Sequence, residues 1–473
     1  MSVSWQSAMI ATLRWSWWWR WLKSLGWALL ALLVMAICAW TWWHYSAQKR
    51  LEEALAEMDS AEPGWRLEDI EAAREQIPEE KNSARVVVAA GKLLPHPWPP
   101  NEFEDRSFGL QPSESLAADD FARLTQELAA VRPALEEARK LVNFPKGRHR
   151  IAYKSDMSTP LEDQTLTRLV SMLLTCDAHY HAQTRSPIAG LISSRAALNA
   201  ARSLGDEPLG TSQVVRMACI AMGCRAIERT LGQGEQPPVE LTATQKLLED
   251  EEVFPDLLIS ARGQRAVTHD TYDAIESGRI NVISLSTNRP PNWTERLKGR
   301  FYRTVVLNEH PTMLALMNRW VALTRLPPHE QAAAEQELEQ EIRDLPKPAS
   351  LTRLIFPSVT KLGGASRRKH AILRCTVVAL ASERYRQATR KWPESLDKLC
   401  PQFLKAVPRD PFDGEPLRYR RVEDGVVIYS VSSDGVDNNG NLDRERPNQP
   451  GVDIGCRLWD IAKRRQPPRP KPP

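Results

Sequence analysis

A run of 20 residues without a charged side chain, Ser24 to Trp43, constrains this chain more than any other feature. At about 1.5 Å of rise per residue, a helix of that length is roughly 30 Å long, which matches the hydrocarbon core of a bilayer. The sequence therefore predicts one transmembrane helix, which we place at residues 24–45, and a membrane as a partner of the chain.

Tryptophan residues mark both ends of this apolar run. They are Trp15, Trp17, Trp18, Trp19 and Trp21 on one side and Trp40, Trp42 and Trp43 on the other. Indole rings favour the headgroup region, so this pattern indicates an aromatic belt at each interface. A cleaved signal peptide would have a shorter apolar core followed by small residues, whereas this run ends in Trp-Trp-His-Tyr. We therefore expect an uncleaved signal anchor.

Basic residues near the span indicate its orientation. Arg14, Arg20 and Lys23 precede it with no acid nearby, while Lys49 and Arg50 after it are soon followed by glutamates. This small excess of basic charge favours a cytoplasmic Trp/Arg-rich leader at residues 1–23. The expected location is the cell inner membrane, single-pass, with the bulk of the chain periplasmic.

Charge and cysteine usage exclude some classes of function. The formal net charge is +4 on 473 residues, and no basic face with neighbouring aromatics is evident, so nucleic acid is not an expected partner. The seven cysteines form no CxxC pair and have no His cluster beside them, so a zinc site is not expected. The six cysteines after Cys38 could pair in an oxidising compartment, and isolated buried thiols are the alternative.

Hydrophobic periodicity predicts a mainly α fold after the anchor. We expect a juxtamembrane helix and a Pro-rich connector at residues 46–111, then an irregular multi-helix domain at residues 112–360. Apolar residues recur at steps of three and four from Phe121 to Val142, and Pro133 predicts a kink or restart there. Short polar loops between consecutive helices favour antiparallel pairs, without a regular repeat.

The C-terminal part has a different pattern. A helix is expected over residues 367–391, followed by two β-rich runs at 417–421 and 426–431 around a Glu-Asp-Gly turn. We therefore expect a small α+β module at residues 365–460. The last residues, 461–473, are rich in Pro and Arg and are expected to be a disordered tail.

Four segments of this module occur in a recognisable order. They are ERYRQATRKWPESLDKL, PRDPFDGEPLRYRR, VVIYSVSSDGVDNNG and GVDIGCRLW. In this order they resemble the C-terminal domain of the major pseudopilin of type II secretion systems, which is the protein G-like family. The resemblance covers about a fifth of the chain and implies a pseudopilin-like fold for residues 365–460.

The acidic loop of that family binds calcium, so the resemblance implies a calcium site here. The metal ligands it implies are Asp434, Asp437 and Asp453, with Asn439 and Asp443 as weaker candidates. Calcium takes six to eight oxygen ligands, which an irregular loop can supply from carboxylates and carbonyls. The alternative is that the Asp-Gly and Asn-Gly pairs of this loop only form turns with positive φ.

The membrane end of the chain departs from the pseudopilin pattern. Pseudopilins carry a basic leader, a peptidase cleavage site and a glutamate five residues into the apolar helix, whereas Trp27 to Ala31 contains no acid. About 320 residues also separate the expected span from the module. We therefore interpret residues 365–460 as a pseudopilin-like module within a protein that is not a pilus subunit.

The helical middle resembles a second group of proteins. It contains GWRLEDIEAAREQIPEEKNSA near its start and ALNAARSLGDEP further on. These segments resemble a family of uncharacterised membrane-anchored proteins from Planctomycetes-type bacteria. That resemblance implies no activity.

Common catalytic motifs do not occur in the sequence. There is no GxSxG, HExxH, GxxxxGK[ST] or GxGxxG. His179 and His181 are two apart on an expected helix, so they do not face one site, and we expect ordinary surface histidines. We therefore expect a non-catalytic protein with a protein-contact or scaffolding role in the cell envelope or near a secretion assembly. The alternative is an envelope hydrolase whose site is built from scattered residues.

Overall fold

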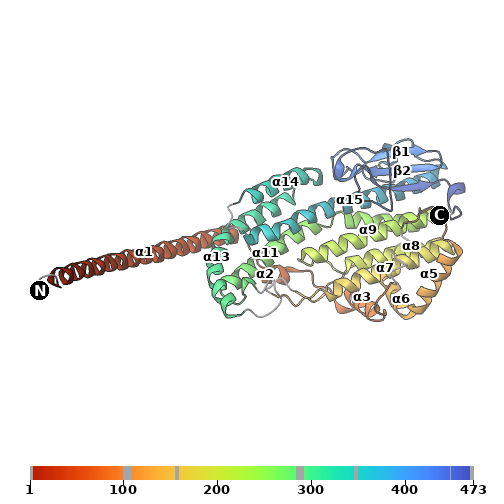
Figure 1. The fold of residues 1–473 in the computed structure, drawn as a ribbon. Coiled ribbons are helices and arrows are strands. Elements are labelled where there is room, and N and C mark those ends of the chain that lie inside the picture. The colour runs from red at the N-terminus through yellow and green to blue at the C-terminus, as the bar shows by residue number, and fades with distance from the viewer. Residues whose placement is uncertain are drawn as a thin grey trace. The chain divides into compact units, whose positions relative to one another are not determined.

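The computed structural model describes residues 4–99, 109–154, 159–283, 292–345, 350–447 and 449–468. The chain divides into two compact units, residues 1–63 with 272–315 and residues 64–271 with 316–473. The fold is mainly helical with one small antiparallel sheet near the C-terminus, as the sequence predicts (Figure 1).

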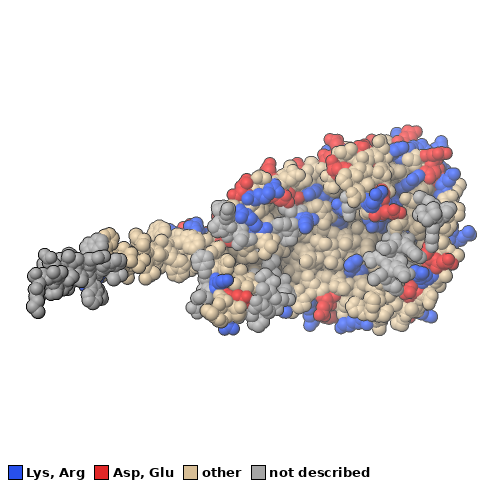
Figure 2. Space-filling view, viewed as in Figure 1, with Lys and Arg blue, Asp and Glu red and all other residues tan. Residues whose placement is uncertain are grey.

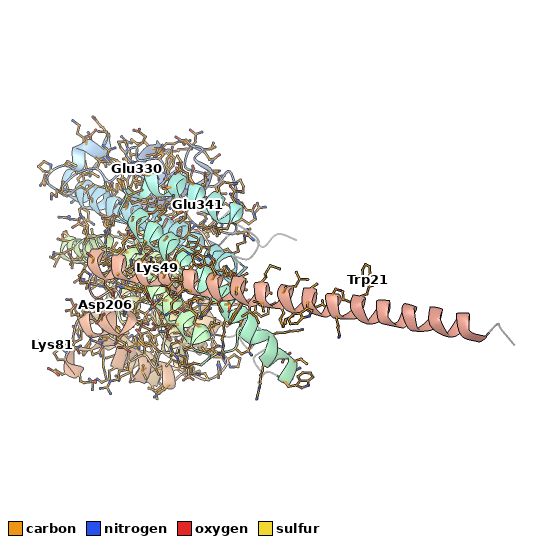
Figure 3. All side chains as sticks on the ribbon, turned by 90° about the vertical axis from the view of Figure 1, so that its left-hand side faces the viewer. Trp21, Lys49, Lys81, Asp206, Glu330 and Glu341 are labelled. Atoms are coloured by element: carbon orange, nitrogen blue, oxygen red, sulfur yellow. The ribbon has the colours of Figure 1, made fainter. Side chains whose placement is uncertain are left out.

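The first unit begins with α1, one helix from Ser4 to Ala61. It joins the predicted transmembrane segment to the charged helix after it. The stretch Lys23–Ala61 is long and apolar enough to cross a membrane, and its most apolar window has a mean hydropathy of 2.0 and no buried part. In Figure 2, part of the surface of α1 carries no charged residues. Figure 3 shows α1 as one continuous helix through Trp21 and Lys49.

The side chains from Lys23 to Trp43 are exposed all round the helix. Trp27 is 71% exposed and Trp42 is 72% exposed, and Trp21 at the start of the stretch is also exposed. So much apolar surface is stable only in a non-aqueous environment. A membrane anchor and a signal sequence both have this character. The side chains of the earlier tryptophans, Trp15 to Trp19, lie outside the described residues.

The rest of the first unit comes from the end of α11 (Asp256–Glu276) and most of α13 (Trp293–Leu323). Arg50 of α1 donates a hydrogen bond of 2.9 Å to the side-chain oxygen of Asn308. His310 Nδ1 lies 2.8 Å from Glu276 Oε1, which connects α13 to α11. These polar contacts connect α1 and α11 to α13.

The second unit starts with four short helices and two 3-10 turns. They are α2 (Leu67–Ala73), η1 (Glu79–Lys81), α3 (Ser83–Lys92), α5 (Ala118–Ala130), α6 (Arg132–Arg139) and η2 (Lys140–Asn143). The break between α5 and α6 is the restart expected at Pro133, which has no amide hydrogen to continue a helix. The sequence does not predict a helix at α3, because its three consecutive valines favour a strand. Asn82 stabilises the start of α3, since its side chain accepts a 3.0 Å bond from the Ala84 amide.

Three longer helices form the centre of this unit: α7 (Glu162–Gln183), α8 (Pro187–Arg202) and α9 (Gly210–Gln233). They are joined by short loops and pack against one another, as expected for antiparallel neighbours (Figure 1). Where α8 crosses α9, a Cβ on Gly223 would lie 2.6 Å from Leu198 Cδ2. Glycine at this position therefore allows the two helices to approach closely.

Further described helices of this unit are α10 (Pro238–Glu252), α14 (Pro328–Asp344) and α15 (Ser350–Thr389), and the first part of α11 and the end of α13 also belong to it. α15 begins well before the expected Arg367, and both α10 and α14 pack against it. Leu338 and Ile342 of α14 are buried while most of its acidic residues are exposed or half-buried, which fits a solvated acidic face. Trp320 is fully buried, as its position on an apolar stripe indicates.

The sheet has the order β1-β2-β3 with both pairs antiparallel. Its strands are β1 (Arg418–Val422), β2 (Gly425–Ser430) and β3 (Ile454–Trp459). Val422 pairs with Gly425 across a two-residue turn, so the predicted hairpin is confirmed. The 3-10 turns η3 (Leu396–Leu399), η4 (Ser432–Asp434) and η5 (Ile461–Lys463) flank the strands.

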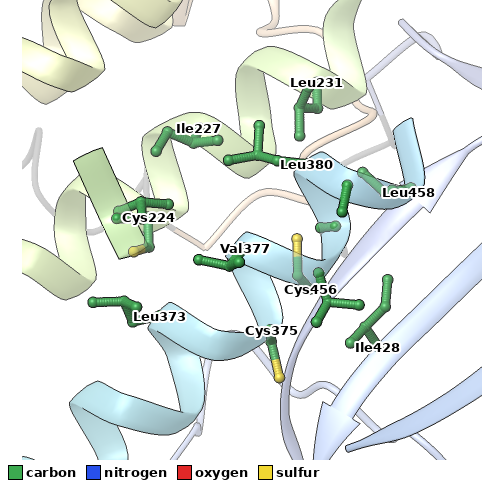
Figure 4. Packing of buried hydrophobic residues seen from close by; sticks show 14 of the residues in the cluster. Cys224, Ile227, Leu231, Leu373, Cys375, Val377, Leu380, Ile428, Cys456 and Leu458 are labelled. Carbon is green, nitrogen blue, oxygen red and sulfur yellow. The ribbon is translucent and has the colours of Figure 1, made fainter. Parts of the chain in front are cut away.

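One hydrophobic cluster joins the sheet to the helices. Figure 4 shows Ile227 of α9 and Leu380 of α15 in the same cluster as Ile428 of β2 and Leu458 of β3. All four side chains are fully buried. The α+β module and the helical segment before it therefore share one core.

The C-terminal tail differs from the expectation of disorder at residues 461–473. Arg464 is only 6% exposed, and its Nη2 lies 2.8 Å from Glu383 Oε2 of α15. The backbone of Gln466 exchanges hydrogen bonds of 2.7 and 2.8 Å with Ser113 and Ser115. A composition rich in Pro and Arg favours disorder, but these long-range contacts hold the tail as far as Gln466. Residues 469–473 lie outside the described residues.

Candidate functional site

The predicted calcium ligands lie in the loop between β2 and β3, which we call the acidic loop (residues 432–453). Asp434 accepts hydrogen bonds from the backbone amides of Val436 at 3.1 Å and Gly451 at 2.8 Å. The bond from Gly451 is the main reason that the pKa of Asp434 is lowered. Asp434 therefore joins the two ends of the acidic loop through its backbone.

Asp437 and Asp453 also accept hydrogen bonds from backbone amides of the acidic loop. Asp437 Oδ1 accepts from the Tyr429 hydroxyl at 3.1 Å and from the Asn439 amide at 2.8 Å. The two oxygens of Asp453 accept from the amides of Asn438 at 3.4 Å and Gly440 at 2.8 Å. Burial raises the pKa of Asp453 despite these bonds. The three carboxylates thus face separate amides of one irregular backbone.

The weaker candidates have contacts of their own. Asp443 Oδ1 accepts from the amides of Glu445 and Arg446, both at 3.0 Å. Asn439 has a φ of +57°, as expected for a turn, and its carbonyl accepts from Arg420 at 2.7 Å. Within the described ranges, no group of three or more His, Cys, Asp or Glu side chains is placed to hold a metal ion. The carboxylates of the acidic loop accept hydrogen bonds from its own backbone, and calcium binding stays a prediction from the resemblance.

A cavity of about 80 Å³ lies where the acidic loop meets α9, α15 and β3. Four arginines line it, and we call it the arginine pocket: Arg225 and Arg229 of α9, Arg368 of α15 and Arg444 of the acidic loop. The carboxylates at its wall are Glu228, Asp443 and Asp453. The sequence positions of these side chains are far apart, so the pocket depends on the tertiary fold.

Glu228 and Arg444 form a buried ion pair at the pocket. Arg444 donates through both terminal nitrogens to the two oxygens of Glu228, and the Arg457 amide donates to Glu228 at 2.7 Å. Burial alone lowers the pKa of Arg444, but the charge of Glu228 outweighs it and the net shift is upward. This bidentate pair fixes the acidic loop on α9.

The other three arginines of the pocket have depressed pKa values. Burial lowers the pKa of Arg229 to about 10. Burial also lowers the pKa of Arg225, which the charge of Arg444 lowers further, and it lowers the pKa of Arg368. Burial is the first cause of all three shifts, so each guanidinium group is withdrawn from water without an opposite charge that fully offsets the loss.

Two cysteines, Cys224 and Cys456, also line the arginine pocket. Burial raises the pKa of Cys224 to about 12 and raises that of Cys456 well above its ordinary value. Such thiols are poor nucleophiles, because the thiolate is the reactive form. All seven cysteines are free, and five of them are buried, which matches the buried-thiol alternative of the sequence analysis.

His179 also lines the pocket, which corrects the expectation of a surface histidine. It is only 4% exposed because the face of α7 that carries it packs within the central helices. His181 is half-buried and lies 3.5 Å from Asp177. The helical period predicts correctly that the two histidines point in different directions. It does not predict that other segments cover both of these faces of α7.

A second arrangement joins a serine, a histidine and an aspartate. His149 Nε2 lies 3.2 Å from the Ser203 hydroxyl, and His149 Nδ1 lies 3.1 Å from Asp163 Oδ2. These are the contacts of a hydrolytic triad. Ser203 is fully buried at the end of α8, however, and a Cβ on Gly147 would lie 2.6 Å from its Cα. In this conformation a substrate does not reach the hydroxyl, and the three residues join the start of α7 to the end of α8.

A larger hollow of about 560 Å³ lies between the end of α15 and the turn end of the sheet. We call it the basic groove. Its cationic lining residues are Arg386, Arg390, Lys391, Lys398 and Arg421, and its acidic ones are Glu394 and Asp460. Trp392 lies beside these charges, and its indole nitrogen donates to Asp460 at 2.6 Å. Tyr385 and Ile461 add further apolar surface.

Comparison of the chain with known protein families, curated proteins and solved structures gave no match. The arginine pocket, the basic groove and the Ser203–His149–Asp163 arrangement were not found by sequence reasoning. The arginine pocket and the Ser203–His149–Asp163 arrangement join segments that no local pattern connects. The basic groove lies mostly along residues 385–398, and the fold adds Arg421, Asp460 and Ile461 to it.

Proposed function

We propose that this chain is a non-catalytic, single-pass membrane protein whose folded part acts by contacting another protein of the cell envelope. The exposed apolar surface of α1 supports membrane anchoring. The excess of Lys and Arg before the span supports a periplasmic position for the bulk of the chain. The basic groove is the observation that carries the protein-contact role.

The basic groove has the composition of a recognition surface for an acidic partner. The side chains of Arg390, Lys391, Lys398 and Arg421 are exposed, and within the described ranges they make no hydrogen bond or ion pair. Trp392 and Tyr385 provide aromatic surface beside them. Arg, Trp and Tyr are the residues that most often contribute strongly to protein interfaces. We infer an acidic protein segment as the occupant.

The pseudopilin-like order of segments points to the kind of partner. The long helix α15, the β1–β2 hairpin, the acidic loop and β3 follow one another in the order that the resemblance implies. A module of this kind fits a partner in or near a secretion assembly. Because it shares a core with α9, the module serves as a rigid part of a larger binding surface.

The test is crosslinking in native membranes with a photoreactive residue at position 398. The full-length chain should give one specific crosslinked protein, and an acidic peptide should compete while a basic peptide should not. The charge reversals Lys391→Glu and Arg421→Glu together should reduce the crosslink at least tenfold, because they replace attraction by repulsion. The matched control reverses Lys81 and Lys92, which are exposed lysines outside the groove.

Two outcomes would contradict the proposed contact. One is a chain that runs as a free monomer with no specific crosslink. The other is a crosslink that survives the groove reversals as well as it survives the control. Added salt should weaken a true contact of this kind, since exposed charges are screened over about 10 Å at 0.1 M.

The alternative function is an envelope hydrolase, and one observation favours it. Ser203, His149 and Asp163 have the mutual distances of a hydrolytic triad, although Ser203 is buried. A fluorophosphonate probe that labels the wild-type chain but not Ser203→Ala would support this alternative. Absence of labelling in intact membranes, where any activating partner is present, would exclude Ser203 as a nucleophile.

A further inference from the structure

The arginine pocket contains positive charge that the described residues do not neutralise. Of its four arginines, Arg444 is paired with Glu228. Arg225 and Arg368 make no hydrogen bond or ion pair with any residue in the described part of the chain. Arg229 donates only to backbone carbonyls, those of Gln111 at 3.4 Å and Glu114 at 3.1 Å.

Arg229 is the most informative of these residues. It is 3% exposed, and its Nε has no hydrogen-bond partner among the described residues. A buried guanidinium with an unused donor is costly, because it has lost water without gaining a full set of acceptors. The Nε of Arg444, at the same pocket, is also buried without a partner there. Both donors call for an acceptor that the described residues do not provide.

The carboxylates at the pocket wall do not supply this acceptor. Glu228 is taken up by Arg444 and by the Arg457 amide. Asp453 is bonded to amides of the acidic loop, and Asp443 is bonded to the amides of Glu445 and Arg446. The cavity of about 80 Å³ is therefore bordered by spare cationic donors and by acids that are already engaged.

We propose that the arginine pocket binds one small oxyanion of the phosphate type. Its volume is about two to three times the roughly 30 Å³ that a water molecule occupies in the liquid, which suits a single oxyanion. It is well below the roughly 300–1,000 Å³ of sites for larger ligands. Guanidinium groups match phosphate oxygens in geometry and charge.

Each arginine has a separate part in this site. Arg229 contacts the anion from the buried end, and Arg225 and Arg368 close on it from the more open side. Arg444 holds the acidic loop against α9 through Glu228 and offers its remaining donor to the anion. The bound anion thereby joins α9, α15 and the acidic loop.

The experiment is calorimetric titration of the detergent-solubilised full chain with inorganic phosphate at constant ionic strength. One saturable site is expected, together with a rise in melting temperature, because a ligand that binds only the folded chain stabilises it. Arg225→Gln and Arg368→Gln should each weaken binding at least tenfold. Arg225 is exposed and Arg368 is half-buried, and neither makes a hydrogen bond or ion pair with a described residue, so the variants should fold normally.

Three comparisons decide the outcome. Arg132→Gln removes an equal charge from the exposed face of α6 and should leave phosphate binding unchanged. Sodium chloride at matched ionic strength should give no saturable heat, which separates a site from general screening. Glycerol phosphate, which carries the headgroup chemistry of a lipid, should bind more weakly than free phosphate because of the small volume.

Stronger binding of glycerol phosphate would assign the site to a lipid headgroup and overturn the proposal of a free oxyanion. The proposal also fails if phosphate gives no saturable heat at millimolar concentration. Equal affinities in wild type, Arg225→Gln and Arg368→Gln would place any binding outside the arginine pocket and would contradict it too.

Discussion

Arg464 and Glu383 form a buried ion pair, with 2.8 Å between Nη2 and Oε2, although Arg464 belongs to a segment whose composition favours disorder. Glu383 is fully buried on α15 and also accepts two bonds from Arg386. Burial raises the pKa of this carboxyl, but the two arginines outweigh that effect and the net shift is downward. The tail is thus a structural part of the second unit.

Removing the charge of Arg464 should destabilise the second unit strongly. Arg464→Met leaves the fully buried Glu383 with one partner fewer, and breaking a buried pair in this way costs about 3–5 kcal/mol. The free energy of unfolding in urea measures the effect. Lys463→Met is the control, because Lys463 is the exposed neighbour. Equal stability of the two variants would show that the tail does not dock on α15 in solution.

Protonation of His179 should make the fold sensitive to mild acid. Burial lowers its pKa well below the ordinary value, and Arg229 lowers it further, so the folded chain keeps this side chain neutral. Below about pH 6.5 the unfolded chain binds a proton that the folded chain does not. Stability rises with pH wherever the unfolded state binds more protons, so this contribution falls as the pH drops.

The measurement is urea unfolding of wild type and His179→Gln at several pH values from 7.5 to 5. The stability of wild type relative to the variant should decrease on acidification, by up to about 1.4 kcal/mol per pH unit. A difference between the two chains that is the same at every pH would mean that His179 titrates alike in both states.

Calcium should have little effect on the acidic loop if its hydrogen bonds hold it as described. The carboxylates of Asp434, Asp437 and Asp453 already accept from backbone amides and a tyrosine hydroxyl. We expect the same melting temperature in millimolar calcium and in chelator. Asp453→Ala should lower it in both conditions, because two amides lose their acceptor. A saturable rise with calcium that Asp453→Ala abolishes would instead establish the site that the resemblance implies.

The parts of the fold that could be predicted from sequence rest on local signals. Twenty uncharged residues indicate the apolar stretch of α1, and Pro133 marks the break between α5 and α6. The Glu-Asp-Gly sequence predicts the β1–β2 hairpin, whose two turn residues are Glu423 and Asp424. In each case neighbouring residues carry the information.

The parts that could not be predicted depend on contacts between distant segments. Glu228 and Arg444 are 216 positions apart, and nothing in either neighbourhood marks them as partners. The three valines of α3 oppose helix locally, yet tertiary packing buries Val86 and Val87 in a helix. The acidic loop has the composition of a cation site, and the hydrogen bonds from its backbone amides to its carboxylates could not be predicted from that composition.

We propose that α1 keeps the chain in a membrane, where its folded part meets a partner. The most direct test is alkaline carbonate extraction of native membranes followed by measurement of the mass of the retained chain. If α1 is a membrane anchor, the membrane pellet should contain the whole chain of 53.5 kDa, with its N-terminal residues present. A soluble form shortened by removal of the apolar stretch would show that α1 acts as a cleaved signal sequence and would contradict the account.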